Sequence, residues 1–174
     1  FNTMWAPLVY RWVKDGKIRS TEIKNKVENI AFKDSLAVLC ITILTIVCSY
    51  FVPYFLPEDY AKIYLILPLC VLSLLLYTLS EVTSIGINLM KKTQYTLFSC
   101  FFAIVVHVIS SVLLIPKLGA IGAAISSGIS FYVFLLARSF YSNNIWIKLN
   151  LHKVNIISFL SLLISSMPIL IYMF

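Results

Sequence analysis

One carboxylate lies deep inside an apolar stretch of this sequence. Glu81 is the only acidic residue within a predicted membrane span, where a charge costs at least ~2.5–3.5 kcal/mol. Polar residues recur around it at spacings of three and four, which places them on one face of a helix. They are Ser73, Tyr77, Ser80, Glu81, Ser84 and Asn88. This face predicts a cavity wall with a titratable or cation-attracting carboxylate, a hydrogen-bonded seam between helices, or a site near the inner membrane interface.

A histidine lies near the middle of the next apolar stretch. His107 shares one side of that stretch with Ser99, Ala103, Ser110 and Ser111. An intramembrane histidine can relay protons or pair with a carboxylate. Glu81 and His107 lie on consecutive antiparallel spans, and their depths differ by about one helical turn at ~1.5 Å per residue. The sequence leaves two alternatives open, a pair with Glu81 and a hydrogen bond to another helix.

Arg138 falls near the inner end of a later span. One interpretation is that its long side chain extends to the lipid headgroups. The other is that its guanidinium faces a cavity and contacts an anionic substrate, because it matches phosphate oxygens well. Lys91 and Lys92 are interpreted as topology anchors.

The elements that position these residues are predicted to be membrane-spanning helices. The chain has 174 residues, of which 60% are hydrophobic and 12% charged, and its mean hydropathy is +0.93. Soluble domains carry roughly 25% charged residues, so a soluble globule, a disordered tail and a collagen-like fibre are excluded. The apolar runs are too long for barrel strands and do not alternate, so an all-α polytopic bundle is predicted. The five predicted spans are 35–56, 63–90, 95–115, 120–141 and 154–174.

Two further segments precede these spans. Residues 1–14 are predicted to be the end of a truncated transmembrane helix, and residues 15–34 a cytoplasmic amphipathic helix or loop. We expect the chain to be a piece of a longer protein.

Charge and cysteine usage narrow the function classes. The formal charge is +7, and all basic residues except Lys62 and Lys117 fall on one side of the predicted bundle. That bias predicts cytoplasmic basic loops and no nucleic-acid partner. The cysteines at 40, 48, 70 and 100 lie inside apolar spans without metal-ligand spacing. With no paired carboxylates and no nucleophile constellation, the sequence predicts no metal, no cofactor and no enzyme.

Small residues follow the turn at 116–119. Gly119, Ala120, Ala124 and Gly128 are spaced so that one helix can approach another closely, which is typical of packing in lipid. The glycine spacings of phosphate-binding loops are absent.

Three stretches together resemble a known family. Ile115-Pro116-Lys117-Leu118-Gly119-Ala120-Ile121-Gly122-Ala123-Ala124-Ile125, Gly86-Ile87-Asn88-Leu89-Met90-Lys91-Lys92-Thr93 and Trp5-Ala6-Pro7 resemble motifs of bacterial polysaccharide repeat-unit flippases. These flippases belong to the superfamily of multidrug, oligosaccharidyl-lipid and polysaccharide exporters. The resemblance implies about twelve helices in two bundles around a cavity, with this chain as most of the second bundle. The span at 154–174 departs from the pattern, because not all members have it.

The resemblance implies a flippase for lipid-linked oligosaccharides in the bacterial cytoplasmic membrane. Its substrate would be an undecaprenyl diphosphate bearing a sugar repeat unit for O-antigen or lipopolysaccharide synthesis, moved by alternating access. Its partners would be that substrate, membrane lipids and an N-terminal bundle. We hypothesise that Arg138 attracts the diphosphate and that Glu81 couples transport to H⁺ or Na⁺. The predicted cavity is lined by Glu81, Ser84, Asn88, Tyr77, His107 and Arg138, with serines at 126–130, 158, 161 and 165 as further polar faces.

Other functions stay open on the sequence. The nearest is another exporter of the same superfamily, such as a drug/cation antiporter or a peptidoglycan-precursor flippase. A membrane enzyme such as an O-antigen polymerase and a non-transporting scaffold are the remaining alternatives.

Overall fold

The fold is an all-α bundle, as the sequence predicts. The computed structural model describes residues 2–14, 20–55, 57 and 63–173. Within these ranges there are seven α-helices and one short 3-10 helix. They are α1 (Asn2–Lys14), α2 (Ser20–Ser49), η1 (Val52–Tyr54), α3 (Ile63–Thr83), α4 (Ile85–Leu89), α5 (Gln94–Leu118), α6 (Ala120–Ile145) and α7 (His152–Met173).

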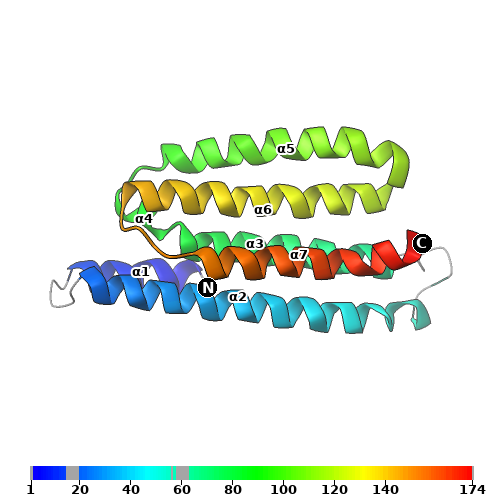
Figure 1. Cartoon of the computed structure of the whole chain (residues 1–174), viewed down its shortest axis with the longest axis horizontal. Helices are drawn as coiled ribbons and strands as arrows, with labels where there is room; N and C mark the ends of the chain where they lie inside the picture. Colours follow the sequence, from blue (N-terminus) through cyan, green and yellow to red (C-terminus); the bar gives the residue numbers. More distant parts are fainter. Residues whose placement is uncertain (1, 15–19, 56, 58–62, 174) are drawn as a thin grey trace.

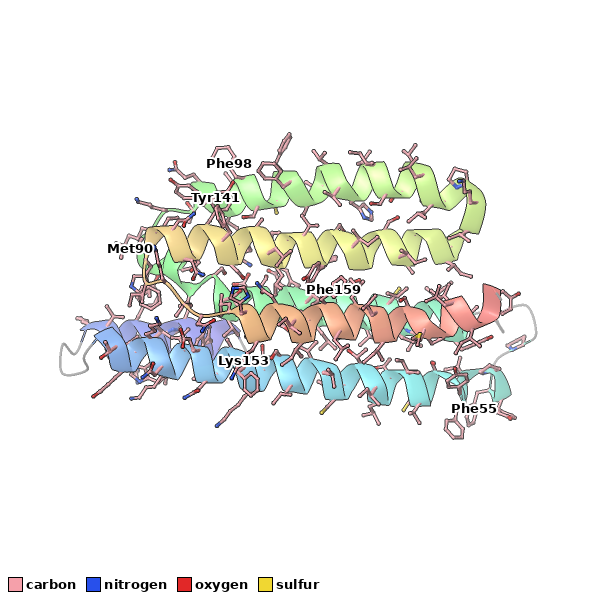
Figure 2. The ribbon with its side chains drawn as sticks, in the orientation of Figure 1. Phe55, Met90, Phe98, Tyr141, Lys153 and Phe159 are labelled. Atoms are coloured by element: carbon pink, nitrogen blue, oxygen red, sulfur yellow. The ribbon has the colours of Figure 1, made fainter. Side chains whose placement is uncertain are left out.

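Five of the described helices are long and apolar enough to cross a membrane, namely α2 with η1, α3, α5, α6 and α7. Large apolar side chains, including those of Phe55 and Phe98, point away from the bundle (Figure 2). In water such a surface would be unfavourable, whereas hydrocarbon solvates it. The protein is therefore a multi-pass membrane protein.

The long helices lie side by side in one elongated bundle (Figure 1). α6 packs against α5 on one side and α3 on the other, α3 packs against α2, and α7 contacts α2, α3 and α6. The short helices α1 and α4 lie together at one end and contact α3. The larger apolar core connects the helices at this end of the bundle. Its buried residues include Val9, Val27, Leu79 and Leu149.

The structure replaces the two segments predicted at 15–34 and 35–56 by one helix from Ser20 to Ser49. Its buried face continues across the predicted boundary through Ala31, Ser35 and Val38. No proline or glycine occurs between 20 and 49, so nothing in the backbone ends the helix there. Residues 15–19 lie outside the described residues.

The span predicted at 63–90 is interrupted. α3 ends at Thr83 and α4 begins at Ile85, with Ser84 between them at φ −93° and ψ 11°. The backbone N–H of Gly86 donates a hydrogen bond to the Ser142 hydroxyl of α6 at 3.1 Å. A Cβ at Gly86 would come within 2.7 Å of the Ser142 Oγ. Contact with α6 thus accompanies the break, and glycine makes that approach sterically feasible.

Candidate functional site

Glu81 and Arg138 form an ion pair between α3 and α6. The Arg138 Nη1 donates to the Glu81 Oε1 and also to the Ser80 Oγ, the latter at 3.0 Å. Both residues are buried, with exposed fractions of 8% for Glu81 and 3% for Arg138. Removing either charge would leave the other unpaired in a medium of low dielectric constant, which is strongly unfavourable.

Neutral hydrogen bonds extend this contact toward α4. The Ser139 hydroxyl donates to the Thr83 Oγ1 at 2.8 Å, and the Gly86–Ser142 bond continues the series. The Glu81 face is therefore a hydrogen-bonded interhelical seam, the second of the three arrangements considered for it. α3 also ends soon after Glu81, at Thr83, as the third arrangement requires. Arg138 lies inside this seam, so its side chain does not extend to the membrane surface as one interpretation had it.

His107 does not meet Glu81. Its Nδ1 lies 3.4 Å from the Ser130 Oγ of α6, and Ser130 also donates to the Ser127 carbonyl. Glu81 is engaged by Arg138 instead. The sequence placed both groups at similar depth, but the two helices are not neighbours: α5 packs on α6, and α6 separates it from α3.

A groove of about 350 Å³ follows α6 between α3 and α5. Its walls are mostly apolar, and its polar groups are the His107 ring, the Tyr77 hydroxyl and two serine hydroxyls. The lining residues are Tyr77, Cys100, Ala103, Ile104, His107, Ser127, Ser130, Phe131 and Phe134. Its volume is at the lower end of the range of about 300–1,000 Å³ that is typical of ligand pockets.

One aromatic residue joins this groove to the ion pair. Phe134 stacks on Tyr77 with ring centroids 6.1 Å apart and planes 6° from parallel. The Arg138 Cζ lies 5.1 Å from the centroid of the same Phe134 ring. A cation over an aromatic face is attracted by the ring quadrupole. The ion pair therefore lies directly behind the groove wall without opening into it.

The two remaining predicted cavity residues, Ser84 and Asn88, lie in different places. Ser84 is buried between α3 and α4, and no hydrogen bond to its hydroxyl is found among the described residues. Asn88 lies at the end of the bundle, where its backbone carbonyl accepts a hydrogen bond from the Tyr10 hydroxyl at 2.8 Å. Neither residue lines the groove that contains Tyr77 and His107.

Of the four residues predicted to pack helices together, two lie against another part of the bundle and two do not. Ala124 is buried, and a Cβ at Gly128 would meet a Leu69 methyl group at 3.3 Å. Gly119 ends α5 at φ +58°, with nothing within 4 Å of a Cβ built there, and Ala120 is exposed. Gly119 thus serves the turn and not a helix contact.

Metal ligands do not gather in the described part of the chain, where no group of three His, Cys, Asp or Glu side chains could hold an ion. The groove can instead offer aromatic faces, hydroxyl groups and an imidazole to a bound molecule. Sequence reasoning missed Phe134, because an aromatic residue in an apolar helix carries no signal of what it contacts. In comparisons with known proteins, no family model, no curated protein and no solved structure matches this chain.

Proposed function

We propose that this chain forms part of a flippase that moves an undecaprenyl-diphosphate-linked oligosaccharide from the cytoplasmic to the outer leaflet by alternating access. The observation that carries the proposal is the groove between α3 and α5, which presents polar groups within membrane-spanning helices. The motif resemblance described above points to the same class of substrate. The basic ends of the helices lie in the cytoplasm in this proposal, following the positive-inside bias.

The groove suits a substrate with a polar head and an apolar tail. Polar side chains within a membrane normally face protein or a cavity, because exposing them to hydrocarbon is unfavourable. His107 and the hydroxyls of Ser127 and Ser130 would hydrogen-bond sugar hydroxyls, while Tyr77 and Phe134 offer flat faces to sugar rings. The polyprenyl tail would remain among the lipid chains outside the groove.

The volume indicates that this chain would contribute one wall of a larger passage. A groove of about 350 Å³ holds only part of an oligosaccharide diphosphate. The proposal therefore includes a second helical bundle that faces the groove. Rocking between two such bundles would expose the bound head group to each side of the membrane in turn.

The ion pair has a different role from the two predicted for its members. Arg138 reaches the groove only through the Phe134 ring, so it is a poor candidate for direct contact with a diphosphate. Glu81 is already paired, so a coupling cation would have to displace the guanidinium. In this proposal the pair keeps α3 and α6 together.

A transport assay tests the proposal. The full protein is reconstituted in proteoliposomes with a fluorescent polyprenyl-diphosphate oligosaccharide, and translocation is measured as accessibility to an added glycosidase. The double variant His107→Ala with Ser130→Ala is expected to slow translocation at least tenfold. The control variant Ser111→Ala, on α5 like His107 but outside the groove, should not slow it.

Deletion of the gene gives an independent test in cells. Lipid-linked repeat units are expected to accumulate at the cytoplasmic leaflet while surface polysaccharide disappears. Normal surface polysaccharide in the deletion strain would refute the proposed function, as would equal translocation rates in the groove and control variants.

A further inference from the structure

A second cavity lies at the end of the bundle where α1 meets α4. It has a volume of about 450 Å³ and is separate from the groove. It is lined by Tyr10, Arg11, Val13, Lys14, Leu89, Met90 and Trp146. Met90 marks this end in Figure 2, opposite the end marked by Phe55. Two of these lining residues are cations, and none of them is acidic.

Burial of one face of α1 directs its cations toward this cavity. Val9 is fully buried and Trp5 is 4% exposed, both in the larger core. Arg11 and Lys14 are exposed on the other side of the helix. The Tyr10 hydroxyl donates to the Asn88 carbonyl at 2.8 Å and links α1 to α4. The basic residues are thus carried by a helix with two attachments to the bundle.

The cavity wall opposite α1 is formed where α4 packs closely against the end of α6. A Cβ at Gly86 would lie 2.8 Å from the Trp146 Cβ, so only a glycine lets α4 approach the end of α6 this closely. The approach places Trp146 beside Leu89 and Met90 in the cavity wall. The cavity thus has one wall on α1, which carries its basic residues, and an opposite wall of apolar and aromatic side chains.

This division matches the chemistry of a lipid headgroup region. Guanidinium and ammonium groups donate charge-assisted hydrogen bonds to phosphate oxygens. Tyrosine and tryptophan favour the boundary between membrane and water, and basic pockets between transmembrane helices bind anionic lipid headgroups. We infer that this cavity binds one anionic phospholipid, with its phosphate at Arg11 and Lys14 and its glycerol and upper acyl chains against Val13, Leu89 and Met90. The inference does not depend on the proposed transport function.

The experiment measures lipid binding to the full protein in detergent by native mass spectrometry, with phosphatidylglycerol and phosphatidylcholine as probes. Phosphatidylglycerol is expected to bind more tightly than phosphatidylcholine to the unaltered protein. The double variant Arg11→Gln with Lys14→Gln should weaken phosphatidylglycerol binding roughly 30-fold, at about fivefold for each charge. The matched control is Lys33→Gln with Lys148→Gln, which removes the same charge from exposed residues outside the cavity.

A second arm uses sn-glycero-3-phosphoglycerol, a soluble molecule with the same phosphodiester headgroup as phosphatidylglycerol. It should not displace phosphatidylglycerol at millimolar concentration, because it lacks the acyl chains. Displacement would identify the ligand as a free phosphate compound and overturn the lipid assignment. Equal losses in the two double variants, or equal binding of the two lipids, would show a diffuse charge effect and overturn the site. If the double variant does not fold, each single variant is expected to show the fivefold loss.

Discussion

Replacing Glu81 by glutamine is expected to destabilise the protein far more than replacing both members of its ion pair. In the variant, the Arg138 guanidinium remains at a position that is 3% exposed, with the Ser80 hydroxyl as a neutral partner. Breaking a buried pair from one side costs about 3–5 kcal/mol. Because glutamine still offers a carbonyl oxygen to the guanidinium, we expect a loss near 3 kcal/mol.

The double variant Glu81→Gln with Arg138→Met removes both charges. Replacing a whole buried pair by neutral groups is often close to neutral, so most of the loss should be recovered. Since each single variant should lose at least about 3 kcal/mol and the double variant only about 1 kcal/mol, the sum of the two single losses should exceed the double-variant loss by about 5 kcal/mol. Ser139→Ala is the matched control in the same seam, and loss of its hydrogen bond to Thr83 should cost only ~0.5–1.5 kcal/mol.

The assay is reversible unfolding of the full protein in mixed micelles with an increasing fraction of sodium dodecyl sulfate. Folded fraction is followed by tryptophan fluorescence, and each variant is compared at the same micelle composition. A loss below ~1 kcal/mol for Glu81→Gln, or additive losses in the two single variants, would refute the conclusion that the pair acts as one buried unit.

Three further predictions test the packing and the groove. Gly86→Ala should cost ~1–3 kcal/mol, because the new methyl group would lie within 3 Å of the Ser142 Oγ and the Trp146 Cβ. Gly128→Ala should cost less than ~1 kcal/mol, since its nearest neighbour is a movable leucine methyl group 3.3 Å away. Equal losses in the same unfolding assay would contradict this difference. Gly119→Ala should lower stability by ~1–2 kcal/mol through its φ of +58° alone, and an unchanged unfolding midpoint would argue against that strain. Cys100, in the groove wall, should react with a water-soluble thiol reagent faster than Cys70 when each is the sole cysteine, because the reagent reaches a thiol only where water enters. Equal rates, measured by mass spectrometry, would mean a dry groove.

Much of the fold could be predicted because its signals are local. Apolar runs of helical length predict spans, and the start of α6 just after Gly119 was predicted correctly, whereas α5 continues through Pro116 to Leu118, where a turn was predicted. The extent of α2 was not predicted, since the polar composition of its first turns suggested a separate surface helix. The break at Ser84 was also missed, because it accompanies a contact with Ser142, 58 residues later, that no local pattern reports.

For the candidate site, too, the sequence predicted the residues but not their contacts. The sequence identified Glu81, His107 and Arg138 as residues that need special surroundings, since polar groups are costly in hydrocarbon wherever the chain places them. It could not choose their partners. α5 and α3 are consecutive spans, yet α6 packs between them, so Glu81 pairs with Arg138 and His107 approaches Ser130.

The sequence by itself determined the solvent, the helices and the residues whose burial requires a partner, because these follow from side-chain polarity and spacing along the chain. Only the tertiary structure decided which polar groups meet and where a groove remains. Those outcomes depend on which helix faces pack together, and packing in lipid is governed by shape and close contact between segments far apart in sequence.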